Sequence, residues 1–223
     1  MRLIQKLLGT LGLAFVAAGA AASPAQPQEG VDYTRLPQAQ TVESGKKVEV
    51  IEFFWYSCPH CAALEPTLVD WVKKKGDAIS FKRVPVAFRD TFVPQQKLYY
   101  TLEAMGRVDD MHEKVFHAIH VGRNPLDSDK RILDFVVSQG IDRQKFEDMY
   151  NSFTVTSKTQ QAAKLQKAYQ VDGVPLLAVG GMYKTSPALI SKNFNARSAA
   201  ELHGATLQVV DHLITKAASG SKN

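Results

Sequence analysis

The sequence predicts an α/β fold in which one mixed sheet is interrupted by a helical insertion. A strand–helix–strand pattern near the start, about sixty residues with helical patterns only, and a closing hairpin followed by a helix lead to this expectation. The chain has 223 residues, which suits one compact domain with an insertion or two small domains. Its 45% hydrophobic share excludes a disordered chain, and two cysteines are too few for a four-thiolate metal site or a disulfide-stapled miniprotein.

Residues 1–22 read as a signal peptide. Arg2 and Lys6 form a positive start, and Leu7–Ala18 is apolar but short for a membrane span. Small residues follow, so we expect cleavage after Ala22. The alternative is an uncleaved N-terminal anchor. Either way, the rest of the chain is expected in an exported compartment, where thiols can be oxidised.

The charge of the chain does not point to nucleic acid. The formal net charge of +5 falls to +3 once Arg2 and Lys6 are removed with the signal peptide. The longest basic run is Lys73–Lys75, with no interleaved aromatic residues. We therefore expect no nucleic-acid partner.

The first structured unit is a βαβ pattern. Val48–Tyr56 is almost continuously apolar, β-branched or aromatic, which predicts a strand buried on both faces. Cys58–Lys75 has a helical stripe and lysines in its last turn, and Gly76 ends it. Ile79–Phe88 reads as a second strand, so the two strands should be parallel.

The stretch from Phe92 to Asn151 contains only amphipathic helical patterns, separated by glycines and one Gly-Arg-Asn-Pro turn. The helical segments expected there are Leu98–Met105, Met111–His120, Ile132–Gln139 and Phe146–Tyr150.

The end of the chain returns to the sheet. A helix over Thr154–Tyr169 precedes a short strand, Leu176–Val179. Gly180 and Gly181 predict a hairpin turn into a return strand, Met182–Lys184. Ser198 begins an S-A-A-E capping box, which predicts a final helix through Thr215.

Both cysteines lie in Cys58-Pro59-His60-Cys61, where the first strand meets its helix. A structural disulfide is one alternative, but so short a loop removes little chain entropy. A metal pair lacks further cysteine or HxxxH ligands, and haem attachment needs a histidine after the second cysteine. Redox chemistry is the favoured interpretation, with no metal site and no cofactor.

The position of the motif predicts which cysteine reacts. Near the helix N-cap, unpaired N–H groups and the positive dipole end should stabilise a Cys58 thiolate and lower its pKa. Pro59 suits the first turn because its missing N–H would have no partner. His60 adds positive charge, or is only an exposed turn residue. Cys61, one turn inward, should be the shielded resolving thiol.

These residues resemble a known family. The stretch V-E-V-I-E-F-F-W-Y-S-C-P-H-C is similar to the active-site strand and helix start of the thioredoxin superfamily, and Pro-His is typical of DsbA-type bacterial periplasmic thiol:disulfide oxidases. Gly173-Val174-Pro175 resembles the family's cis-proline loop, and Asn151–Phe153 its return from insertion to core. The resemblance implies a thioredoxin fold with an inserted all-helical domain: a discontinuous thioredoxin-like domain of 23–90 and 153–223, and a helical insertion of 91–152.

The resemblance also implies residue roles. Glu52 matches a glutamate that lies under the disulfide and relays protons, and Lys82 matches its associated lysine; the alternative for Glu52 is an edge-strand charge that faces water. Val174 and Pro175 are implied to form a cis peptide bond that turns the Val174 backbone toward Cys58 and binds an extended substrate peptide.

Several other residues have structural expectations. Ser57 differs from the aromatic residue or glycine of well-known family members, and Pro66 should kink its helix. Glu65 either projects near the site or is a helix-surface charge, and the second interpretation is favoured. Trp55 and Tyr56 line the peptide surface or pack in the core.

Three histidines, His112, His117 and His120, share one predicted helix without carboxylate support. We expect ordinary surface or packing roles for them rather than metal binding.

The expected function is that of a monomeric periplasmic dithiol oxidase, which donates the Cys58–Cys61 disulfide to unfolded, newly exported proteins. The resemblance alone implies re-oxidation by a DsbB-type quinone-coupled membrane protein. An isomerase or reductase is the nearest enzymatic alternative, although too few residues precede the first strand for the dimerisation domain of isomerases. A peptide-binding chaperone with a structural disulfide is the non-enzymatic alternative.

Overall fold

The computed structural model describes residues 26–43, 45 and 47–220. The signal peptide expected at residues 1–22 lies outside these residues. Within the described part, no helix combines the length and apolar character that a membrane crossing requires.

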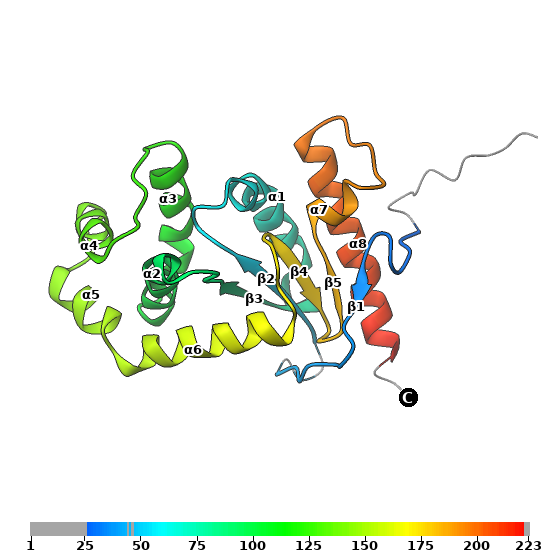
Figure 1. The fold of residues 1–223 in the computed structure, drawn as a ribbon, viewed down its shortest axis with the longest axis horizontal. Helices are drawn as coiled ribbons and strands as arrows, with labels where there is room; N and C mark the ends of the chain where they lie inside the picture. Colours follow the sequence, from blue (N-terminus) through cyan, green and yellow to red (C-terminus); the bar gives the residue numbers. More distant parts are fainter. Residues whose placement is uncertain (1–25, 44, 46, 221–223) are drawn as a thin grey trace, which may run out of the picture.

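A five-stranded mixed sheet forms the centre of the fold (Figure 1). Its strands are β1 (Thr34–Arg35), β2 (Val48–Phe54), β3 (Ile79–Pro85), β4 (Leu176–Val179) and β5 (Tyr183–Thr185), in the order β1-β5-β4-β2-β3. The expected parallel pair, β2 with β3, and the expected hairpin, β4 with β5, are both present, and β2 pairs antiparallel with β4. Every residue of β2 after Val48 is buried although successive side chains point to opposite faces, so the prediction of a strand buried on both faces is confirmed.

Eight helices surround the sheet in the described residues. They are α1 (Pro59–Lys75), α2 (Val93–Ala104), α3 (Val108–His120), α4 (Asp129–Ser138), α5 (Arg143–Tyr150), α6 (Phe153–Ala168), α7 (Pro187–Ile190) and α8 (Ala199–Gly220), with 3₁₀ turns at Gly76–Ala78 and Asp90–Phe92.

The helices divide between the faces and one end of the sheet. Side chains of α1 and α8 pack with Val50, Leu177 and Val179 in one core cluster, whereas α6 packs on Phe53 in the other. Helices α2 to α5 extend this second cluster beyond the sheet as a helical block (Figure 1). The alternation of side chains along β2 places Val50 and Ile51 in different clusters, whereas Phe53 and Phe54 both belong to the second cluster.

The observed bounds depart from the predictions at several ends. Helix α2 begins at Val93 rather than Leu98, because Pro94 fits a first turn where no N–H partner is needed. Strand β1 and helix α7 are too short to show a periodic pattern and were not expected. At α8, Ser198 accepts the N–H of Glu201 at 3.1 Å, but the Glu201 carboxylate accepts from Arg197 rather than closing the capping box.

Candidate active site

Cys58 occupies the N-cap of α1, as the sequence predicts. Its backbone is extended (φ −79°, ψ 115°), and its sulfur accepts the N–H of Cys61 at 3.4 Å. Both cysteines are thiols in this structure. A hydrogen bond from the Cys61 thiol, helped by the backbone N–H groups of Cys61 and His60 and by the His60 charge, outweighs burial and lowers the pKa of Cys58 to about 6. At neutral pH Cys58 is therefore largely a thiolate.

Cys61 has the opposite electrostatics. It has no exposed surface, and burial, followed by its interactions with Cys58 and Glu52, raises its pKa far above the ordinary value. The pair is thus strongly asymmetric, with an outer sulfur that carries charge readily and an inner sulfur that does not. His60 and Pro59 are exposed, so the charge of His60 acts on Cys58 from the solvent side.

The Val174–Pro175 peptide bond is cis, as the resemblance implies. The Val174 carbonyl lies 3.4 Å from the Cys58 sulfur, which donates to it as a thiol. The expected approach of this backbone to Cys58 is therefore confirmed.

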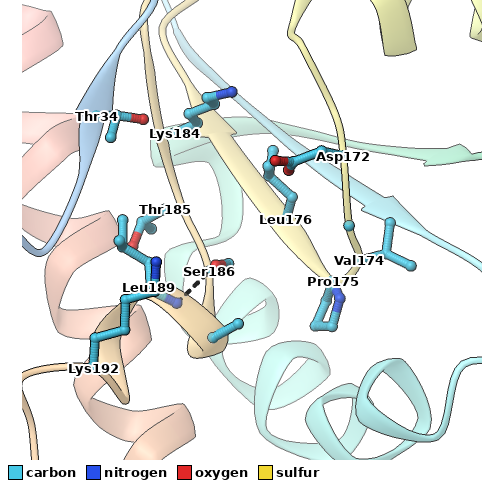
Figure 2. Close-up of a pocket in the computed structure, with 12 residues that line it drawn as sticks. Thr34, Asp172, Val174, Pro175, Leu176, Lys184, Thr185, Ser186, Leu189 and Lys192 are labelled. Atoms are coloured by element: carbon cyan, nitrogen blue, oxygen red, sulfur yellow. Dashed lines mark hydrogen bonds between the residues drawn. The ribbon is translucent and has the colours of Figure 1, made fainter.

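A groove of about 480 Å³ adjoins the cis-proline loop (Figure 2). It runs from Val174 and Pro175 across β5 to α7, where Leu189 and Lys192 line it. The groove is open to solvent and begins at the backbone that contacts Cys58. It therefore lies beside Cys58, where a chain segment bound in it would come close to this sulfur.

Glu52 is completely buried on β2, which has a strand on each side, so the alternative of an edge charge facing water is wrong. Its Oε2 accepts from Arg83 Nε at 3.1 Å, while Oε1 has no hydrogen-bond partner among the described residues. Burial, together with the charge of Glu65, raises the pKa of Glu52 to about 8 despite the Arg83 guanidinium. Glu52 consequently holds a proton at neutral pH.

The partner expected for Glu52 is corrected by the sheet register. Glu52 lies opposite Arg83, whereas Lys82 lies opposite Ile51 and so projects from the other face. Lys82 forms ion pairs with Glu49 and Glu43 instead. The cation beside Glu52 is therefore Arg83, and the expectation for Lys82 is wrong.

Glu65 also departs from its expectation as a surface charge. It is 6% exposed, and its Oε1 accepts from Arg83 Nη2 at 2.7 Å. Burial raises its pKa, but His112 and Arg83 more than compensate and hold the pKa of Glu65 below the ordinary value. A sequence signal existed, because Glu65 follows Cys61 by four residues and so lies on the same face of the helix.

The surroundings of His112 differ from those expected from the sequence. It is buried, its Nδ1 lies 2.8 Å from the Tyr56 hydroxyl oxygen, and its Nε2 lies 3.5 Å from Glu65 Oε1. The assumption that these histidines lack carboxylate support is therefore wrong for His112. His117 is exposed, and His120 Nε2 contacts the Tyr56 carbonyl oxygen at 2.8 Å.

Two residues of the loop before Cys58 connect it to the helical block. Trp55, half-buried, stacks on Phe92 with ring centroids 3.8 Å apart, and the Ser57 hydroxyl accepts from Gln95 Nε2 at 2.6 Å. Tyr56 is buried, so of its two expected places the core is the correct one.

Pro66 lies within the continuous helix α1. Among the residues described, no cluster of three or more His, Cys, Asp or Glu side chains is arranged to hold a metal ion.

A cysteine pair at a helix N-terminus, beside a cis-proline loop and on a mixed sheet of this order, defines a thiol:disulfide oxidoreductase of the thioredoxin type. A family model described as the DSBA-like thioredoxin domain matches residues 49–197, and the chain belongs to this family. Sequence relatives include a "Thiol:disulfide interchange protein DsbA" of Burkholderia cepacia, 50% identical over 188 residues that cover 83% of this chain and 89% of the relative. Another, of Bordetella pertussis, is 40% identical over 216 residues, or 96% of this chain and 99% of the relative.

Solved structures agree with this assignment. The crystal structure of Pseudomonas aeruginosa DsbA is similar with a TM-score of 0.79 and 36% identity, over 88% of this chain and 97% of that one. The expected thioredoxin fold with a helical insertion and the expected thiol:disulfide oxidoreductase activity are both confirmed.

Proposed function

We propose that Cys58 and Cys61 are the redox-active pair, and that their disulfide is donated to newly exported, unfolded proteins in the periplasm. The observation that carries this proposal is the stabilised thiolate of Cys58, with its pKa of about 6. A stable thiolate favours the reduced protein, so its disulfide accepts electrons readily and acts as an oxidant.

The reaction proceeds in two exchange steps. A substrate thiolate attacks the Cys58 sulfur, a mixed disulfide forms, and the Cys61 sulfur leaves with the electron pair. A second substrate thiolate then attacks the substrate sulfur of the mixed disulfide and releases Cys58 as a thiolate. The substrate gains one disulfide, and Cys58 and Cys61 together gain two electrons.

Glu52 supplies the proton that the buried leaving group needs. Because the Cys61 thiolate is strongly disfavoured by burial, its departure requires protonation, and Glu52 is protonated at neutral pH. Re-oxidation reverses the transfer, when Cys61 gives its proton to the Glu52 carboxylate. His60 and Pro59 contribute through the charge and the geometry of the first helical turn.

Substrates bind as extended segments along the backbone at Val174 and Pro175 and in the adjoining groove. Pairing with main-chain groups accepts many sequences, which suits a donor with broad specificity. We further propose that the protein acts as a monomer, that residues 1–22 direct its export, and that a DsbB-type quinone-coupled membrane protein re-oxidises it. The division into 23–90 with 153–223, and 91–152, stays a prediction.

The deciding experiment is a titration of the reduced protein, in which ultraviolet absorbance reports the thiolate. We expect an apparent pKa of about 6 that disappears in Cys58→Ser and persists in Cys61→Ser. Equilibration with glutathione should leave the protein almost wholly reduced. A pKa near the ordinary cysteine value of 9.0 would refute the oxidase proposal and favour a reductase. Unchanged disulfide formation in cells carrying Cys58→Ser would favour the chaperone alternative.

A further inference from the structure

The buried polar side chains near the cysteines include one from the helical block, His112, to which the reaction described so far assigns no role. His112, on α3, faces Glu65 of α1, which shares Arg83 of β3 with Glu52 of β2. Two carboxylates thus share a single guanidinium in a site where both are at least 94% shielded from solvent. A second uncompensated negative charge is costly there, so the two carboxylates retain one proton between them at neutral pH.

The positive and N–H groups are divided unequally between the two carboxylates. Glu65 Oε1 accepts from Arg83 Nη2 at 2.7 Å, and His112 Nε2 lies 3.5 Å from the same oxygen, close enough for an electrostatic contact although Nε2 has no hydrogen-bond partner among the described residues. Glu52 receives only Arg83 Nε, at 3.1 Å. Negative charge is more stable on the carboxylate that faces more donors, which here is Glu65.

The contacts of His112 determine which ring nitrogen carries its proton. Burial raises the pKa of Tyr56 well above its ordinary value, so its hydroxyl stays protonated and shares a hydrogen bond with Nδ1 at 2.8 Å. We assign the hydroxyl as the donor, because the opposite tautomer would turn an unprotonated Nε2 toward the Glu65 carboxylate. Burial also lowers the pKa of His112, despite the opposing influence of Glu65, and the ring is neutral. The single ring proton then lies on Nε2, the ring nitrogen that is 3.5 Å from Glu65 Oε1, an oxygen that can only accept.

The remaining surroundings of His112 are aromatic. The ring centroids of Phe54, Tyr99 and Phe116 lie 5.1 to 5.9 Å from the centroid of the imidazole. These rings give Glu65 no aqueous surroundings that would take over the stabilisation by the Nε2–H group. Of the charged groups that act on His112, Glu65 favours a positive ring and Arg83 disfavours it.

We propose that His112 is a positioning residue for the exchange reaction: its Nε2–H holds the negative charge on Glu65 and thereby leaves the shared proton on Glu52. Without this donor, the proton moves toward Glu65, and Arg83 pairs with an ionised Glu52. Glu52 could then no longer protonate Cys61, and its charge would oppose the Cys58 thiolate. This inference rests on the proposed proton transfer by Glu52.

The test measures the closure of a mixed disulfide between Cys58 and glutathione, in which the Cys61 thiol transfers its proton to Glu52 and its sulfur displaces glutathione. The rate should rise with ionisation of Glu52, near pH 8 in the unchanged protein. His112→Phe keeps the aromatic site filled but removes the N–H group that faces Glu65. We expect the midpoint of this pH profile to fall by about one pKa unit in this variant, because an N–H group that faces a charged carboxylate stabilises the charge by roughly that amount. His112→Gln, which can still donate, should restore most of the profile.

Matched variants separate the proposal from a general effect of mutation. His117→Phe makes the same change at an exposed position of the same helix and should leave the midpoint unchanged. Tyr56→Phe frees Nδ1 to carry the ring proton and should lower the midpoint by a smaller amount. In a Glu65→Gln background, His112→Phe should cause no further shift.

Unchanged midpoints in both His112→Phe and Tyr56→Phe would overturn the proposal and leave His112 as packing only. An equal shift in the Glu65→Gln background would also overturn it, because the effect would not pass through Glu65. The role of Glu52 is tested separately: if Glu52→Gln keeps the pH dependence of closure, the proposed proton transfer fails irrespective of His112.

Discussion

The low pKa of Cys58 predicts that the stability of the dithiol form depends on pH in a way that the disulfide form cannot share. The thiol has a pKa of about 6 in the folded protein, against an ordinary value of 9.0 for the unfolded chain. Between these values the unfolded state binds more protons, so stability rises with pH. The stabilisation is complete above the unfolded pKa and is lost as the pH falls through 6.

The magnitude follows from the two pKa values. Three pKa units correspond to about 4 kcal/mol in total, accumulated at about 1.4 kcal/mol per pH unit. At pH 7, one unit above the folded pKa, the dithiol form has gained about 1.4 kcal/mol relative to its protonated state. Glu52 is present in both forms, so to a first approximation its contribution cancels in their difference.

The assay is denaturant unfolding of the oxidised and the reduced protein between pH 5 and pH 8. We expect the free energy of unfolding of the reduced form, minus that of the oxidised form, to rise from about pH 6 with the slope given above. Reduced Cys58→Ser, which has no low-pKa thiol, should lack the rise. Parallel curves for the two redox forms of the unchanged protein would refute the reasoning, because the disulfide would then gain nothing from reduction to a thiolate.

Three further predictions concern the groups around the cysteines. Arg83→Met leaves two buried carboxylates without their shared cation and should lower the free energy of unfolding by about 3–5 kcal/mol at pH 7. The loss should be smaller at acidic pH, where both carboxylates are protonated. An equal loss at all pH values would contradict this prediction. Burial raises the pKa of Glu52 above its unfolded value, so this residue stabilises the folded protein at low pH and loses that contribution as the pH rises toward 8. Glu52→Gln should therefore flatten the dependence of the free energy of unfolding on pH, above pH 5, in the disulfide form. Gln95→Leu removes the amide that donates hydrogen bonds to both Ser57 and Pro125. It should lower the free energy of unfolding by about 1–3 kcal/mol and increase hydrogen exchange in the loop before Cys58. Unchanged exchange would show that the loop needs no such support.

The main features of the fold were predictable because they depend on local patterns. The apolar run of β2, the glycine at the end of α1 and the glycine pair between β4 and β5 each specify their element within a few residues. The elements that were missed, β1 and α7, span two and four residues. They are held by partners distant in sequence, as when Thr34 pairs with Lys184, so no periodic pattern marks them.

The arrangement of the cysteine pair was predictable from the sequence alone. The spacing of Cys58 and Cys61 and the start of a helix at Pro59 are local facts, and the stabilisation of the outer thiolate follows from the N–H groups of that same turn. The proximity of Val174 to Cys58, in contrast, joins positions 116 residues apart and was available only through resemblance to a family.

The charged network below the cysteines was decided only by the tertiary structure. The register between β2 and β3 places Arg83, and not its neighbour Lys82, opposite Glu52. A shift of one residue would reverse this, because successive side chains of a strand point to opposite faces. Glu65 and His112 meet only because α1 and α3 pack together over this site. The burial of Glu65 and His112 is a property of this packing, and a single sequence carries no direct record of which helix faces which.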